Sequence, residues 1–201
     1  MMNLTKYKVH CPFESGALDL IDDFLELNES EKLFCELINT DHWNKGIYTV
    51  SGRRFYMPRY QTWYADRGVR YNFSYELHAQ RDWTAALFSL KRKIENYSGA
   101  KFNSVLINWY RNGQDWVDWH SDNENELGDN PVIASVSLGE SRNFYSRHKL
   151  QGGFTTQSLH NGSLLVMYPE YHRNWQHCVP LSPETQNARI NLTFRYVVMP
   201  D

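Results

Sequence analysis

One stretch near the C-terminus decides the fold, the run ARINLTFRYVV at residues 188–198. In an extended strand, successive side chains point to opposite faces of the sheet. The alternation gives an apolar face and a polar face, which hold Ile190, Leu192, Phe194 and Tyr196 on one side and Arg189, Asn191, Thr193 and Arg195 on the other. The pattern indicates a strand of an antiparallel sheet.

The runs that precede this strand have the same character. From residue 101 onward, short β-branched and aromatic segments are separated by turn signals, as in NSVLINWY (103–110), PVIASVSLG (131–139), RNFYSRH (142–148) and GSLLVMY (162–168). Their close spacing leaves no room for helices between them, which favours an antiparallel sandwich or barrel over a parallel α/β sheet.

Two amphipathic helices are expected in the first half of the chain. The first follows NES at residues 28–30, where Asn28 and Glu31 have capping-box spacing, and it continues through Ile38. The second follows Asp82 and stops at Gly99. Residues 48–75 suggest strands joined by loops. We expect a single domain, residues 1–201, that is mainly β with flanking helices around a jelly-roll core at residues 101–201.

Composition narrows the class of protein. The 201 residues are 41% hydrophobic and 22% charged, with 7 Trp, 13 Tyr and 10 Phe, which is typical of a globular chain. A net charge of -2 gives no general attraction to phosphate backbones, so nucleic-acid binding would need local clusters such as Arg53, Arg54 and Arg59. No apolar run or leader suggests a membrane, and Cys11, Cys35 and Cys178 suggest reduced thiols. We expect a soluble intracellular protein.

A candidate metal site begins in WVDWHSDNENE, residues 116–126. His120 and Asp122 are two residues apart, so in extended chain both side chains point to the same side. A third ligand is best supplied by His177 in NWQHCVP, because it follows an apolar strand. Two histidines and a carboxylate form the facial triad of non-haem Fe(II) oxygenases, although zinc accepts the same ligands. The alternatives are a surface loop and a satisfied core histidine.

The polar face of the 188–198 strand is a candidate anion site. Its two arginines, Arg189 and Arg195, suit a dicarboxylate because each guanidinium binds a carboxylate bidentately. If this face turns inward, each arginine needs an anionic partner, because a buried guanidinium without one costs on the order of several kcal/mol. Asn108 and Tyr110 share a face of the VLINWY strand and could close over the same acid. Solvent exposure is the alternative for the polar face of the 188–198 strand, and structural polar groups in a core strand are the alternative for Asn108 and Tyr110.

The order of the motifs resembles the AlkB family of Fe(II)/2-oxoglutarate dioxygenases. It runs through VLINWYRNG, HSDNE, PVIASVSLG, NFYSRHK, HNGSLLVM, WQHCVP and ARINLTFR, with PRYQTWYAD (58–66) upstream. The resemblance implies a double-stranded β-helix with Fe(II) on His120, Asp122 and His177, and O2 as a further co-substrate. It implies that 2-oxoglutarate is held by Asn108, Tyr110, Arg189, Asn191, Thr193 and Arg195.

The resemblance also implies the reaction. It is the oxidative demethylation of N-alkylated bases of the 1-methyladenine and 3-methylcytosine type in DNA, with RNA as a further substrate. 2-Oxoglutarate is decarboxylated to succinate and CO2, and formaldehyde is released. The base would be single-stranded or flipped. The chain would act as a monomer, in the cytoplasm of a bacterium or the nucleus of a eukaryote, with residues 1–100 holding the helices and the nucleotide-recognition region.

By the same resemblance, the substrate-side residues are Ser51, Gly52, Arg53, Tyr64, Asp66, Asn123, Glu124 and Arg147. Glu124 would accept a hydrogen bond from an exocyclic amine, and aromatic walls would come from residues such as Tyr71 and Phe73. Ser51 stands where relatives active on duplex DNA carry a bulky apolar residue, and Ala65 stands where relatives often have glycine. The alternatives are an oxygenase of this fold that acts on RNA, protein or a small molecule, and a non-enzymatic jelly-roll binding module.

Overall fold

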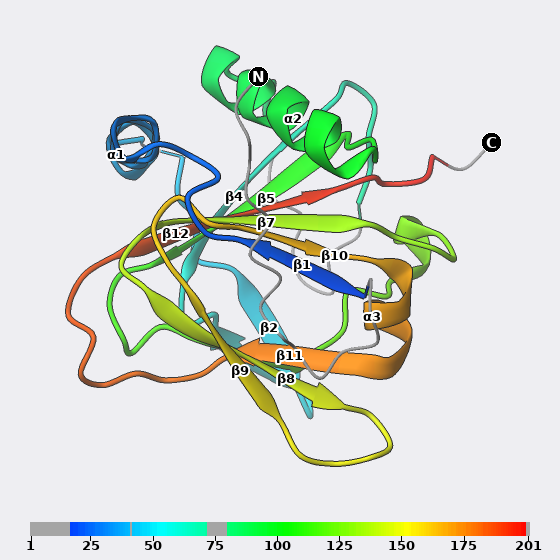
Figure 1. Ribbon diagram of the computed structural model, residues 1–201. Coiled ribbons are helices and arrows are strands. Elements are labelled where there is room, and N and C mark those ends of the chain that lie inside the picture. Colours follow the sequence, from blue (N-terminus) through cyan, green and yellow to red (C-terminus); the bar gives the residue numbers. More distant parts are fainter. Residues whose placement is uncertain (1–16, 41, 72–79, 200–201) are drawn as a thin grey trace.

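The computed structural model describes residues 17–40, 42–71 and 80–199. Its core is a pair of antiparallel sheets, with helices α1 (Leu27–Ile38) and α2 (Ala85–Ser98) on the outer side of the larger sheet (Figure 1). A short helix, α3 (Pro169–Asn174), leads into the smaller sheet. A 3-10 turn spans Asn125–Leu127. The expected class, mainly β with flanking helices around a jelly-roll core, is confirmed.

The larger sheet has six strands. In spatial order they are β1 (Leu18–Ile21), β10 (Leu164–Met167), β7 (Ile133–Gly139), β12 (Arg189–Arg195), β5 (Ser104–Tyr110) and β4 (Tyr60–Ala65). The strand formed by the ARINLTFR run, β12, lies between β7 and β5. The first hundred residues contribute β1 and β4 to this sheet, at its two edges.

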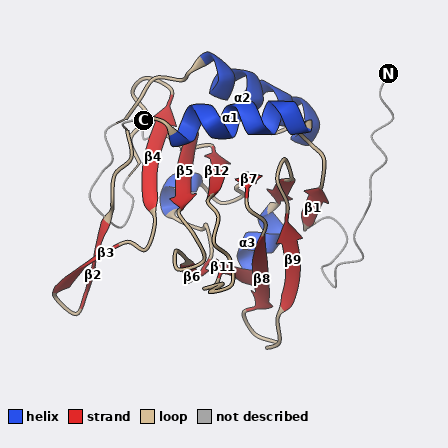
Figure 2. Cartoon of the chain, turned by 90° about the vertical axis from the view of Figure 1, so that its left-hand side faces the viewer, coloured by secondary structure: helices blue, strands red, loops and turns tan. Residues whose placement is uncertain are grey.

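The smaller sheet has four strands. In spatial order they are β6 (Val117–His120), β11 (Trp175–Val179), β8 (Arg142–His148) and β9 (Thr155–Leu159). A separate hairpin, β2 (Ile47–Val50) and β3 (Arg53–Tyr56), projects from the body of the protein (Figure 2). Ser51 and Gly52 form its turn with φ values of 48° and 77°, and positive φ at both central residues is the feature of a type I′ turn.

The helices begin and end close to the predicted positions. The Thr84 side chain caps α2 by accepting from the backbone N–H of Leu87, and Gly99 ends the helix at a φ of 72°. The capping box predicted for α1 is wrong, because the helix begins at Leu27 with Glu26 as its N-cap and no side-chain capping bond. Asn28 already lies inside the first turn. No helix in the described part of the chain is long and apolar enough to cross a membrane.

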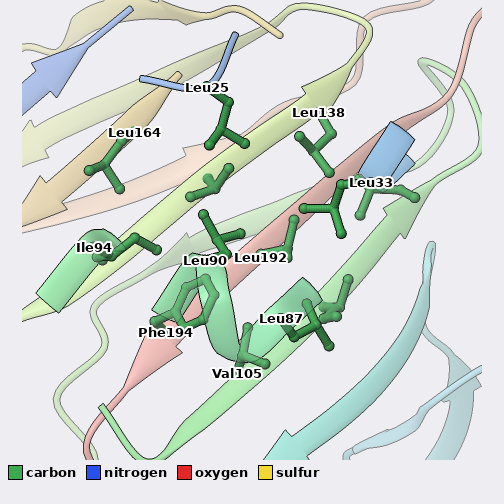
Figure 3. Close-up of a cluster of buried hydrophobic side chains, with 14 of the residues drawn as sticks. Leu25, Leu33, Leu87, Leu90, Ile94, Val105, Leu138, Leu164, Leu192 and Phe194 are labelled. Carbon is green, nitrogen blue, oxygen red and sulfur yellow. The ribbon is translucent and has the colours of Figure 1, made fainter. Parts of the chain in front are cut away.

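The core has two layers, one on each face of the larger sheet. Leu33 of α1 and Leu90 of α2 pack against the outward face, which includes Leu192 and Phe194 of β12 (Figure 3). A second cluster fills the space between the two sheets, and its larger members are Trp63, Leu106, Phe144 and Tyr171. Helices therefore cover the apolar face of β12, and its polar face turns toward the interior between the sheets. Tyr196 lies beyond the end of the strand and is exposed.

Gly113 lies where two loops near the end of the interior meet. Its N–H donates to the Thr185 carbonyl, its own carbonyl accepts from the Ser182 N–H, and a Cβ at this position would lie 1.6 Å from the Ser182 carbonyl oxygen. Gly113→Ala must push the loops apart, so we expect the free energy of unfolding to fall by about 1–3 kcal/mol. Urea denaturation measures the change. Equal stability of Gly113→Ala and the unaltered protein would refute the prediction.

Candidate metal and co-substrate site

Three predicted metal ligands meet at one end of the interior. His120 ends β6 and lies directly opposite His177 on β11, and Asp122 follows two residues after His120. One donor atom from each residue lies within 4.8 Å of the other two. The Nε2 of His177 is 3.7 Å from Oδ2 of Asp122, and the two imidazole centroids are 4.2 Å apart. The structure therefore brings His120, Asp122 and His177 together around one point.

The surroundings of these side chains prepare them to bind a cation. Nδ1 of His120 lies 2.7 Å from the Asp118 carbonyl oxygen, which makes Nδ1 the protonated nitrogen and leaves the Nε2 lone pair free. Burial, with the neighbouring His120, lowers the pKa of His177 well below its usual value and keeps that imidazole neutral. His177 is therefore a neutral donor, and His120 keeps Nε2 for the same point.

The carboxylate is held in its charged form. Burial by itself would raise the pKa of Asp122, but the Arg195 guanidinium and the neighbouring histidines lower it well below its usual range. The Arg195 NH2 group donates to Oδ1 of Asp122 at 2.6 Å, and Oδ2 remains on the side of His177. Two imidazoles and one carboxylate gathered around one point fit Fe(II) with open coordination positions.

Arg189, on the polar face of β12, is a buried arginine with no ion-pair partner among the described residues. It is 1% exposed, its NH2 group donates to the Ser137 hydroxyl at 2.9 Å, and its Nε and NH1 have no hydrogen-bond partner in the described chain. No carboxylate of residues 17–40, 42–71 and 80–199 forms an ion pair with it. Burial lowers its pKa to about 10. A buried guanidinium without a counter-charge is costly, so its surroundings fit an anionic ligand.

The neutral residues of the predicted co-substrate site are already positioned by hydrogen bonds. The Asn191 amide donates to the Ser135 hydroxyl at 2.6 Å, and the Thr193 hydroxyl donates to the Asn191 side-chain oxygen at 2.9 Å. Tyr110 lies under the Arg189 guanidinium, whose carbon is 5.2 Å from the centre of the ring. These contacts leave few rotamers open before any ligand binds.

Arg59 and Gln61 support Asn108, and neither was predicted as a site residue. Its side-chain oxygen accepts from Nε of Arg59 at 2.9 Å and from the Gln61 amide at 2.8 Å. Arg59 is 7% exposed and also donates to the Trp116 carbonyl, so its grouping with the surface arginines Arg53 and Arg54 is wrong. The sequence could have predicted this, because residues two apart in an extended chain point to the same side, and Arg59, Gln61 and Trp63 have that spacing before and within β4.

All nine metal and co-substrate residues line one cavity of about 680 Å³. The same cavity extends to rings and a carboxylate that are not needed for either ligand, namely Tyr48, Trp116, Trp119 and Glu124. Tyr48 belongs to the projecting hairpin, so the cavity reaches from the buried triad toward that hairpin. This volume leaves room for part of a larger substrate beside a small diacid.

Of the predicted substrate-side residues, two line this cavity, Asn123 and Glu124. Ser51, Gly52 and Arg53 lie at the exposed tip of the hairpin. Arg147 lies outside the cavity with its guanidinium over the ring of Trp119, whose centroid is 4.4 Å away. The structure therefore brings the site together in part and leaves the hairpin residues and Arg147 on the surface.

Tyr64 and Asp66 lie elsewhere. Alternation along β4 turns Tyr64 toward the helix-facing core, where it is 3% exposed, so it does not line the cavity as predicted. Asp66 follows the end of β4 and accepts from the Trp83 indole at 2.7 Å. Among the aromatic residues predicted for the pocket, Tyr71 is buried between the sheets and Phe73 lies outside the described residues.

Glu124 and Tyr71 form a polar pair beside the triad. Oε2 of Glu124 is buried with no hydrogen-bond partner in the part of the chain that the structure describes. Burial raises the pKa of Tyr71 above its usual value and keeps its phenol protonated. The charge of Arg195 opposes this shift, and the charges of Glu124 and Asp122 add to it. The pair therefore offers one acceptor that is still open to a ligand.

Comparison with protein families gives a match over most of the chain. The model described as the 2OG-Fe(II) oxygenase superfamily matches residues 17–195. The alpha-ketoglutarate-dependent dioxygenase alkB homolog 3 of Bos taurus is 36% identical over 191 residues, covering 90% of this chain and 66% of the relative. The DNA oxidative demethylase ALKBH2 of Mus musculus is 34% identical over 181 residues, covering 85% of this chain and 76% of the relative. The chain spans less than two thirds of the length of the alkB homolog 3 relatives. For the Rattus norvegicus protein the share is 64%.

Solved structures show the same fold at low sequence identity. The structure of OsALKBH1 matches with a TM-score of 0.63 and 18% identity, covering 91% of this chain and 99% of that chain. A Pseudomonas putida prolyl-4-hydroxylase matches with a TM-score of 0.62 and 16% identity, covering 90% and 94%. At these identities the likeness supports the jelly-roll fold alone.

Proposed function

Because this chain belongs to the AlkB family of the 2OG-Fe(II) oxygenase superfamily, we propose that it removes alkyl groups oxidatively from N-alkylated bases of DNA. The observation that carries the proposal is Arg189, a buried guanidinium without an anionic partner, in the same cavity as the His-Asp-His triad. The sequence relatives named for alkB and for DNA oxidative demethylation direct it toward alkylated DNA.

The residues divide between two ligands. His120, Asp122 and His177 would hold Fe(II), and the six residues named for the diacid would hold 2-oxoglutarate. With O2, these ligands supply the oxidising power to remove an N-alkyl group, with succinate, CO2 and formaldehyde as products. Arg195 already pairs with the metal-side carboxylate of Asp122, so Arg189 is the arginine suited to the carboxylate farther from the metal. The chain contributes binding, orientation and a site shielded from water.

The rest of the cavity would receive the base. A base inside a duplex does not reach a buried triad, so the substrate is single-stranded or flipped out of the helix. Tyr48 and Trp116 offer rings for stacking, and Glu124 offers an acceptor for the exocyclic amine of adenine or cytosine. A carboxylate also favours the cationic lesions 1-methyladenine and 3-methylcytosine.

The test is a set of oligonucleotides that carry 3-methylcytosine or 1-methyladenine, as DNA or RNA and as single or double strands. With Fe(II), 2-oxoglutarate and O2, we expect formaldehyde and unmodified base in equal amounts, measured by mass spectrometry of the bases. Succinate without repaired base in any member of the set would retain the oxygenase and reject nucleobase demethylation. The RNA members separate DNA repair from action on RNA.

Glu124 gives a prediction about the choice of lesion. Glu124→Gln keeps the shape of the side chain but replaces an anionic acceptor with a neutral amide. Hydrogen bonds to charged groups contribute about 1.5–3 kcal/mol, so kcat/KM for a 3-methylcytosine oligonucleotide should fall roughly tenfold or more. Steady-state kinetics measures the change. Glu126→Gln is the control, since Glu126 does not line the cavity; an equal effect of both substitutions would contradict the role of Glu124.

All site residues come from one chain, so we propose that the protein acts as a monomer. Its expected location follows from the substrate: the cytoplasm if the source is a bacterium and the nucleus if it is a eukaryote. Sedimentation of the active protein in the presence of a methylated oligonucleotide tests the monomer.

A further inference from the structure

The outer face of the smaller sheet has no helical cover in the part of the chain that the structure describes. Helices α1 and α2 lie over the larger sheet, on the opposite side of the molecule (Figure 2). Alternation in β8 points Phe144 and Ser146 into the interior, while Tyr145 and Arg147 point outward. On β11, His177 faces the interior and its neighbour Gln176 faces outward.

The outward side chains form a row across this sheet. The Arg147 guanidinium lies over the Trp119 ring at 4.4 Å and donates to the Gln176 side-chain oxygen through Nε at 3.0 Å and NH2 at 2.8 Å. The rings of Tyr145 and Phe154 stack with centroids 5.2 Å apart and an interplanar angle of 22°. The aromatic row, defined as Trp119, Tyr145, Arg147 and Phe154, thus reaches from β6 to the residue before β9.

One end of the aromatic row lies at the cavity. Trp119 lines the same cavity as the triad and directly precedes His120 in β6. The other end is open, since Phe154 is 64% exposed. A chain that places one unit in the cavity could therefore lay its neighbouring units along the row without leaving the protein surface.

The chemistry of the row selects the kind of ligand. Phe154 is exposed, and Trp119 and Tyr145 are half-buried on an open antiparallel sheet. Rings on such a sheet stack with unpaired bases, and an arginine plane adds both stacking and a positive charge. Arg147 makes no ion pair with a carboxylate in the described residues, and its charge remains available to a phosphate. A duplex keeps its base faces stacked inside and does not present them to such a row.

We infer that the aromatic row binds the single-stranded nucleic acid that flanks the base in the cavity. The bases stack on the rings, and Arg147 meets a phosphate of the same strand. This inference rests on the proposed function for its position next to the target base, but the binding that it predicts needs no turnover.

The test compares two variants in binding to an unmethylated single strand of about fifteen nucleotides, within the site size of single-strand binding folds. In the first, Tyr145→Ala is combined with Phe154→Ala. The second is Phe88→Ala, which removes an exposed ring from α2 on the other side of the molecule. By fluorescence anisotropy, we expect the double variant to bind about tenfold more weakly or worse, since base–aromatic stacking is lost, and Phe88→Ala to bind like the unaltered protein. A trinucleotide, too short to follow the row, should bind both variants equally.

Equal affinity of the double variant and Phe88→Ala for the long strand would overturn the inference, as would an equal loss of affinity for a duplex of the same length. Arg147→Gln gives an independent variant, which should flatten the salt dependence of single-strand binding. Thermal unfolding of each variant checks folding. If the unaltered protein repairs no base, the proposed function is refuted. The binding measurements then still test whether the aromatic row binds single strands.

Discussion

His120→Ala is expected to abolish formaldehyde release at every concentration of Fe(II) and 2-oxoglutarate. The substitution removes one of three donors that meet at one point, and the cavity offers no other histidine to replace it among the described residues. Loss of a ligand should exceed the roughly 10- to 100-fold effect that is typical of outer-shell partners. Turnover with a methylated oligonucleotide measures the effect.

A second readout separates metal binding from activity. Equilibrium dialysis of Fe(II) under anaerobic conditions should show one site per chain in the unaltered protein and greatly weakened binding in His120→Ala. His160→Ala is the matched control, because His160 is exposed and contacts Ser141 outside the cavity. Retention of full Fe(II) affinity by His120→Ala would remove this residue from the site.

Arg189→Met is expected to raise the 2-oxoglutarate concentration needed for half-maximal turnover. Truncating one partner of a buried charge pair costs about 2–5 kcal/mol, which corresponds to roughly 30-fold or more in affinity. Methionine fills a similar volume and has no charge. The same substitution should increase the stability of the ligand-free protein by about 1–4 kcal/mol, because it removes a buried guanidinium that has no counter-charge.

Thermal unfolding with and without 2-oxoglutarate measures both effects. Ligand that binds the folded state raises the melting temperature of the unaltered protein, and this shift should be lost in Arg189→Met. Arg173→Met on α3 is the control, since Arg173 is exposed and its ion pair with Glu170 contributes little. A less stable ligand-free Arg189→Met protein with an unchanged response to 2-oxoglutarate would contradict both expectations.

Local patterns predicted the parts of the site that depend on short stretches of chain. The two-residue period of a strand separates Arg189 and Arg195 from the apolar face of β12, and it gives His120 and Asp122 the same side. The order of motifs predicted the family, which the comparisons bear out. The same period also predicts that Tyr64 and Trp63 point to opposite sides, but it does not say which side faces the cavity.

The sequence by itself determined which residues share a face, because that depends on backbone geometry within a few residues. Only the tertiary structure decided which faces meet. The pairing of β6 with β11 sets His177 opposite His120, the pairing of β4 with β5 brings Gln61 to Asn108, and the helices take the face that Tyr64 occupies. Register and layer packing come from contacts between distant segments, and no local period encodes them.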